Sequence, residues 1–107
     1  MNYEVIATPV LPRIKKLAKK YSSLKAEYTE LVGTLSADPN QGTPLGNDCY
    51  KIRLVIASKD KGKSGGARVI SCIKIVESKV YLLTIYDKSE KDSISDKALN
   101  ELLTQID

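Results

Sequence analysis

Apolar and polar positions change their period along the chain. Between residues 14 and 35 apolar side chains recur every three or four positions, which predicts two helices with almost no linker. Thr8-Pro9 supplies an N-cap and a first-turn proline for the first helix, and Ser22 or Ser23 caps the second. Residues 2–7 form a short strand candidate before them. The pattern therefore predicts an antiparallel helical hairpin near the N-terminus.

From residue 49 the period becomes two, which is typical of strands. In the first strand one face carries Tyr50, Ile52, Leu54 and Ile56, and the other carries Cys49, Lys51, Arg53 and Val55. Two further strands, 67–76 and 79–87, are joined tightly at Glu77-Ser78 and predict a hairpin. Residues 37–48 are dense in turn residues and predict a loop.

The chain ends in a pattern that predicts a short helix from about Asp96. Ser95 is its expected N-cap, and Ile94 is placed to pack on Leu99. Together the elements predict an α+β fold: an N-terminal helical hairpin packed on a small, mainly antiparallel twisted sheet, with a short C-terminal helix. The 107 residues suffice for one core, so we expect a single domain over residues 1–107.

Composition limits the cellular location and the kinds of site that we expect. No apolar run approaches the roughly 20 residues that span a membrane, and the first residues do not resemble a signal peptide, so we expect a cytoplasmic protein without membrane contact. In that compartment Cys49 and Cys72 are expected to be buried thiols. Two cysteines without any histidine do not predict a zinc site, and we expect no metal and no cofactor.

The formal net charge of +4 is concentrated in two regions. Residues 10–25 hold six basic residues and no acid, and residues 49–91 hold ten basic residues against four acids. A basic surface favours phosphate-rich partners or acidic proteins. A lysine-rich solvated face without a binding role gives the same totals, so charge alone leaves both interpretations open.

The basic, glycine-rich stretch 59–70 contains the sequence Gly62-Lys63-Ser64, which is the end of a nucleotide-binding P-loop. That motif needs a glycine five residues earlier, where this chain has Ala57, and it must lead into a helix. Here the stretch leads into a predicted strand. It is therefore interpreted as a connection between two strands.

Lys51, Arg53 and Arg68 fall on the sheet face that the helical hairpin does not cover. Without histidine or an obvious carboxylate pair, acid–base chemistry has few other candidates. A lysine crowded by other cations gains access to its neutral form, whereas an arginine stays protonated and suits stabilisation of a developing phosphorane charge. A groove that binds several phosphates and a plain solvated face both remain possible from these residues.

Three segments in order resemble the RelE/HigB superfamily of bacterial type II toxin–antitoxin toxins. They are YKIRL at 50–54, GKSGGARVI at 62–70 and VYLLTIYDKSEKDSIS at 80–95. The resemblance implies a compact toxin that cleaves mRNA on the ribosome, where the RNA 2′-OH attacks the adjacent phosphate. It also implies inhibition of translation, a cognate antitoxin as partner, and operator DNA binding only through the toxin–antitoxin complex.

The resemblance also implies roles for particular residues. Lys51 and Arg53 resemble a strand pair of basic catalytic residues, Arg68 a phosphate-stabilising arginine, and Lys88 an acid or a leaving-group stabiliser. The remaining expected RNA or phosphate contacts are Lys59, Lys61, Lys63, Tyr86 and Lys91. Which of Lys51, Arg53 and Lys88 acts as base or acid stays open.

Two departures from the family pattern keep alternatives open. The C-terminal tyrosine that some RelE toxins stack on a base falls here near Ile94, and Tyr86 is its possible substitute. Lys88 stands where the best-known members have arginine. ParE toxins share the fold but poison DNA gyrase, and a relative without catalysis would act only as a nucleic-acid-binding or regulatory module. The codon preference, the antitoxin and the oligomeric state do not follow from the sequence.

Overall fold

The computed structural model describes residues 2–57, 66–90 and 93–106. Four residues expected to contact phosphate, Lys59, Lys61, Lys63 and Lys91, lie outside the described residues. The described elements are, in chain order, β1 (Glu4–Ile6), α1 (Leu11–Lys20), α2 (Leu24–Ala37), β2 (Thr43–Gly46), β3 (Cys49–Leu54), β4 (Ala67–Lys74), β5 (Lys79–Asp87) and α3 (Asp96–Thr104). Within this part of the chain, no helix combines the length and the apolar character needed to cross a membrane.

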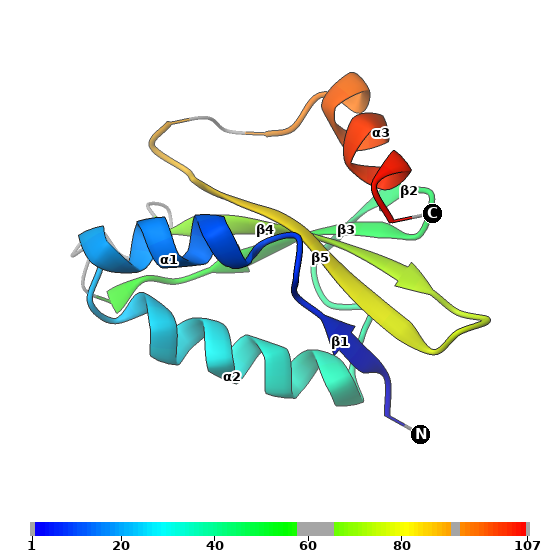
Figure 1. Ribbon diagram of the computed structural model, residues 1–107, viewed down its shortest axis with the longest axis horizontal. Coiled ribbons are helices and arrows are strands. Elements are labelled where there is room, and N and C mark those ends of the chain that lie inside the picture. The colour runs from blue at the N-terminus through cyan, green and yellow to red at the C-terminus, as the bar shows by residue number, and fades with distance from the viewer. Residues whose placement is uncertain (1, 58–65, 91–92, 107) are drawn as a thin grey trace.

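The strands form one mixed sheet in the order β1-β5-β4-β3-β2 (Figure 1). β1 runs parallel to β5, and the pairs β5–β4, β4–β3 and β3–β2 are antiparallel. The predicted α+β class and the mainly antiparallel sheet are confirmed. The two helices follow the short strand β1, as the pattern over residues 2–7 indicated. The β4–β5 hairpin is also confirmed, with Lys74 opposite Lys79 at its end.

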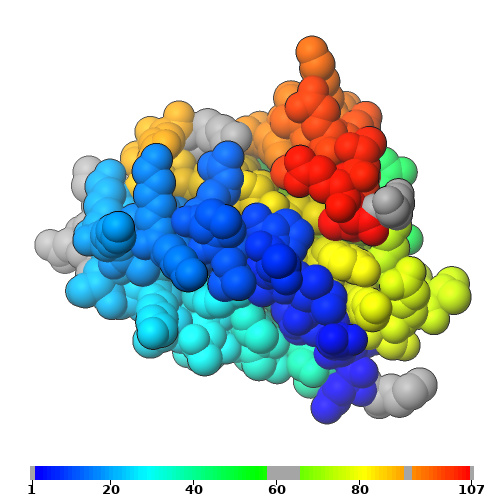
Figure 2. Space-filling view, in the orientation of Figure 1, coloured from blue at the N-terminus to red at the C-terminus, as the bar shows by residue number. Residues whose placement is uncertain are grey.

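α1 and α2 cover one face of the sheet, here called the helix-pair face, and in the space-filling view they lie side by side (Figure 2). Their apolar stripes meet alternate residues of β3, β4 and β5, because successive strand residues point to opposite faces. Each buried side chain of this size contributes on the order of 1.5–3 kcal/mol. The largest fully buried members of this core are Leu24, Leu35, Ile56, Leu82, Ile85, Val10, Val69 and Val80.

α3 lies against the opposite face, here called the α3 face, and stands apart from the other two helices (Figure 1). It closes a second, smaller core. The members of that core are Cys49, Ile70, Cys72, Leu83, Tyr86 and Leu99. The predicted role of Ser95 is confirmed, since its Oγ accepts from Ala98 N at 3.1 Å. The expectation that this face would be either a groove or plainly solvated is therefore wrong for the part beneath α3.

The start of α1 differs from the prediction. The backbone N–H groups of Val10 and Leu11 both donate to Ala7 O, so residues 8–10 form a turn and Val10 takes the N-cap position. Pro12, rather than Pro9, fills the first-turn place. At α2, Ser23 does occupy the N-cap, but its hydroxyl lies 3.1 Å from Glu27 Oε1 and makes no capping hydrogen bond.

Residues 37–48 are not entirely a loop. They include β2, which pairs with β3 through a two-residue turn at Asn47 and Asp48, whose φ angles are 54° and 60°. Asparagine and aspartate tolerate this left-handed backbone, which two-residue hairpin turns require. Pro44 is acceptable because β2 is an edge strand. The many turn-forming residues in this stretch led to the prediction of a loop, although part of it forms a hairpin with β3.

Candidate active site

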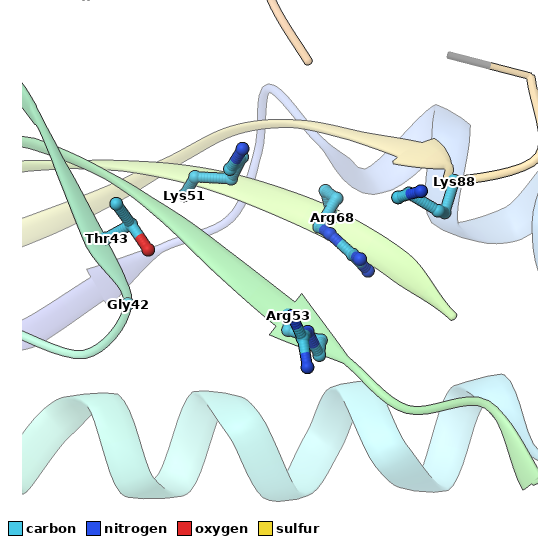
Figure 3. Close-up of a pocket in the computed structure, with 6 residues that line it drawn as sticks. All are labelled: Gly42, Thr43, Lys51, Arg53, Arg68 and Lys88. Atoms are coloured by element: carbon cyan, nitrogen blue, oxygen red, sulfur yellow. The ribbon is translucent and has the colours of Figure 1, made fainter. Parts of the chain in front are cut away.

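The four residues expected to be catalytic line a single cavity of about 510 Å³. Lys51 and Arg53 come from β3, Arg68 comes from β4, and Lys88 follows the end of β5 (Figure 3). We call this space the cation cavity. Its described lining is Gly42, Thr43, Lys51, Arg53, Arg68 and Lys88.

Strand register brings these cations together from distant parts of the sequence. Lys51 and Arg53 share one face because they are two residues apart on β3. Arg53 is the direct cross-strand partner of Arg68, and Arg68 in turn lies opposite Tyr86 of β5. Beyond the last paired residue, Lys88 N donates to Gly66 O at 3.1 Å, which extends the β4–β5 contact to the edge of the cavity.

The four cations differ in burial. Arg68 is only 5% exposed, Lys51 and Lys88 are half-buried, and Arg53 is exposed. The Arg68 Nη1 donates to the neighbouring Ala67 O at 3.1 Å, which helps to hold the guanidinium in place. Arg68 is therefore the most constrained positive charge in the cavity, and Arg53 has the most room to follow a ligand.

The electrostatics of the cation cavity favour an anion. Like charges directly opposite each other on neighbouring strands are destabilising, and Arg53 and Arg68 stand in this relation. The described lining contains four cations and no carboxylate. A bound phosphate would relieve this repulsion and could accept charge-assisted hydrogen bonds from both guanidinium groups.

A carboxylate does lie next to the cavity in sequence, but it faces the helix-pair side. Asp87 is 1% exposed and its Oδ2 accepts from Tyr21 Oη at 2.6 Å, while its Oδ1 accepts from Ser89 N at 2.9 Å and Ser89 Oγ at 2.8 Å. A hydrogen bond with Tyr21 also raises the pKa of Lys20 above its usual value. This network ties the end of α1 to the end of β5, directly before Lys88.

Gly42 and Thr43 line the cavity without having been predicted. Gly42 has φ +99°, and a Cβ there would lie 2.5 Å from Lys51 O, so only glycine lets this segment approach β3 so closely. Thr43 is the register partner of Lys51. The sequence does contain a glycine within a turn-rich stretch at this point. Its close approach to Lys51 could be inferred only once β2 was known to pair with β3.

Tyr86 lies beside Arg68 but is only 4% exposed, with its ring in the core beneath α3. Stacking on a base would require it to leave this position, and that role stays a prediction. The other expected phosphate contacts fall on residues that are not described. The four predicted catalytic residues thus meet at one site, and Tyr86 forms part of its support.

This arrangement can bind a phosphate group and stabilise negative charge that develops on it. Arginine does not give up its proton, so Arg53 and Arg68 suit electrostatic stabilisation. Lysine, unlike arginine, is a residue type that takes part in proton transfer, so Lys51 and Lys88 are the candidates for that role. The cavity therefore suits an anionic group such as a phosphate.

No family model matches this sequence. Among solved structures the chain is similar to a mutant of the E. coli toxin RelE in the free state, with 16% identity, a TM-score of 0.66 and coverage of 99% of both chains. It is also similar to the isolated E. coli RelE toxin, with 21% identity, a TM-score of 0.49, and coverage of 97% of this chain and 98% of that chain. The likeness to the free-state RelE mutant, which covers 99% of both chains, shows that the helices and strands described above form a RelE-like fold.

Proposed function

We propose that this chain is the toxin of a type II toxin–antitoxin system and a ribosome-dependent mRNA endonuclease. The observation that supports the proposal is the convergence of Lys51, Arg53, Arg68 and Lys88 on one cavity whose described lining has no carboxylate. The RelE fold provides the context in which such a site would act on RNA. The proposed substrate is mRNA in the ribosomal A site.

In the proposed reaction the RNA 2′-oxygen attacks the adjacent phosphorus and the bond from phosphorus to the 5′-oxygen breaks. Lys51 is the proposed acceptor of the 2′-hydroxyl proton, because a lysine side chain can take part in proton transfer whereas an arginine stays protonated. Lys88 donates a proton to the departing 5′-oxygen from the other side of Arg68. The products are a 2′,3′-cyclic phosphate and a free 5′-hydroxyl.

The two arginines have separate proposed roles because their burial differs. Arg68 is buried and held by Ala67 O, so it offers a fixed donor where charge develops in the transition state. Arg53 is exposed and guides the phosphate backbone into place. Contacts of this kind position the RNA without reading its sequence.

The proposed partners follow from the same charges. The excess of basic residues between positions 49 and 91 suits an antitoxin segment with acidic side chains that blocks or distorts the cation cavity. The ribosome and mRNA are the phosphate-rich partners, and neither a metal nor a cofactor has a part in the reaction. The proposed location is the cytoplasm, where ribosomes are reached.

The test combines purified ribosomes programmed with a defined mRNA and the purified chain. We expect cleavage in the A site that leaves a 5′-hydroxyl on the downstream fragment, and none with Lys51→Ala. Lys97→Ala, which removes an exposed cation from α3, is the matched control and should cleave normally.

A second measurement separates this proposal from a gyrase poison on the same fold. Incorporation of labelled amino acids and thymidine is followed after expression is induced. Translation should stop first. Arrest of DNA synthesis with translation intact would replace the endonuclease proposal with the gyrase one.

A further inference from the structure

The two cysteines face each other across the sheet. Cys49 is the first residue of β3 and Cys72 lies in β4, and they are direct register partners in the antiparallel ladder. They are 1% and 2% exposed and belong to the small core beneath α3. Both are thiols in this structure. Their pairing is independent of the cation cavity and of the proposed endonuclease activity.

The hydrogen-bond pattern shows which kind of ladder pair they form. Ile73 N donates to Asp48 O at 2.9 Å, so residues 48 and 73 form a hydrogen-bonded pair. The next pair, Cys49 and Cys72, is then of the other kind, because the two kinds alternate along an antiparallel ladder. Such pairs place their Cα atoms about 4.5 Å apart. That separation falls within the range of about 4.4–6.8 Å found for disulfides.

The sulfur atoms point the same way. Cys49 Sγ lies 3.5 Å from Asn47 O, and Cys72 Sγ lies 3.9 Å from the same oxygen. The two thiols also share a hydrogen bond, which together with burial raises the pKa of Cys49 above its ordinary value. The side chains are thus in contact, so bringing the sulfurs into a bond requires little rearrangement of the strands.

One surface cavity borders the cysteine pair. Cys72 lines a cavity of about 760 Å³ between the β4–β5 turn and α3, to which Val76 and Leu103 also contribute. Val76 is fully exposed at the edge of this cavity. Cys72, but not Cys49, is among the described residues that line this cavity, so in the proposal a small-molecule disulfide reacts with Cys72 first, through a local opening that exposes its buried sulfur.

We propose that Cys49 and Cys72 are a redox-sensitive pair that closes reversibly into a cross-strand disulfide. The Cys72 thiolate attacks one sulfur of a small-molecule disulfide and releases its other half as a thiol. The Cys49 thiolate then attacks the Cys72 sulfur in this mixed disulfide and releases the second half. The two cysteines are oxidised, the reagent is reduced to two thiols, and those thiols take up the two protons.

The bond would join β3 directly to β4 and close the loop that carries Arg53 and Arg68. Cross-linking a chain stabilises the folded state mainly by restricting the unfolded one. The bond forms and breaks by thiol–disulfide exchange, which suits a reversible modification. The raised pKa of Cys49 makes closure slow at neutral pH and faster at alkaline pH, because the thiolate is the attacking species.

The experiment incubates the folded, reduced protein with glutathione disulfide, then denatures it in the presence of a maleimide and weighs it. We expect a monomer that has lost two hydrogen atoms and carries no maleimide. Its melting temperature should rise by about 5–15 °C and return after dithiothreitol. Cys49→Ala and Cys72→Ala should show no such rise.

The wild-type protein decides the outcome even if the alanine variants fold poorly. A folded protein that keeps both maleimide sites, while the same chain oxidises once unfolded, would show that the ladder holds the sulfurs apart. A stable glutathione adduct, a disulfide between two molecules, or an unchanged melting temperature after oxidation would equally overturn the proposal.

Discussion

The same strands form both faces of this sheet, but the two faces carry different kinds of side chain. On the helix-pair face every inward residue of β3 after Tyr50 is apolar and buried beneath α1 and α2. On the α3 face the alternate residues divide into a small core beneath α3 and the cation cavity beyond it. Ile52 and Arg53 are neighbours in the sequence, yet one stabilises the fold and the other faces an unfavourable like charge.

This difference indicates how a small fold can keep a cluster of cations whose mutual repulsion is unfavourable. The repulsion between Arg53 and Arg68 costs up to about 1 kcal/mol as a cross-strand pair. A single well-buried leucine on the helix-pair face offsets it. If the cation cavity serves phosphate chemistry, removing its charges should reduce activity while leaving stability unchanged or improved. Removing side chains from the helix-pair core should do the reverse.

The largest expected effect is on catalysis. Arg68→Ala removes the buried cation of the cavity, and single-turnover cleavage of A-site mRNA should fall by about 10²–10³-fold. The melting temperature should not fall in parallel, because the substitution also removes a like-charge contact. A loss no greater than that of Lys97→Ala would show that Arg68 is one phosphate contact among many.

The next effect is on the helix-pair core. Leu82→Ala should lower the free energy of unfolding by about 2–5 kcal/mol, because Leu82 is fully buried and leaves a cavity. Leu102→Ala, at a half-buried position on α3, should cost clearly less. Urea denaturation measures both. Equal losses would mean that the two cores contribute equally and that the contrast between the faces is wrong.

A smaller effect is expected from Tyr21, whose hydroxyl donates to Asp87 and so ties the end of α1 to the end of β5, directly before Lys88. Tyr21→Phe removes the hydroxyl that donates to Asp87 and leaves a buried carboxylate with one donor fewer, at a cost of about 1–3 kcal/mol. Cleavage should also weaken at saturating ribosome, since Lys88 follows Asp87 directly. Thermal unfolding and single-turnover cleavage test this. Tyr28→Phe, on α2, is the control for removal of a tyrosine hydroxyl.

The smallest effect concerns Arg53, the exposed member of the cross-strand pair Arg53–Arg68. Arg53→Gln should raise the free energy of unfolding by about 0.2–1 kcal/mol at low salt, and the gain should shrink as salt screens the charges. The same variant should bind ribosomes more weakly, with a shallower salt dependence. Destabilisation at low salt would show that Arg53 has a favourable partner in the folded state.

Much of the fold followed from the sequence because its signals are local. A helical period fixed both N-terminal helices, an alternating period fixed β3 to β5, and Ser95 marked the start of α3. These patterns reflect contacts that each element makes along its own length. The predicted N-cap at Thr8 was wrong because residues 8–10 form a turn and the helix begins only at Leu11. The strand β2 was not predicted because Pro44, Gly46 and Asn47 are residues typical of loops.

The sequence by itself determined which residues carry the candidate chemistry, since lysines and arginines on one strand face cannot all be core. Only the tertiary structure decided that they meet. Their convergence depends on the register that sets Arg53 opposite Arg68, on the approach permitted by Gly42, and on the cover that α3 gives to half of the second face. Each is a contact between segments far apart in the sequence, and no local period specifies it.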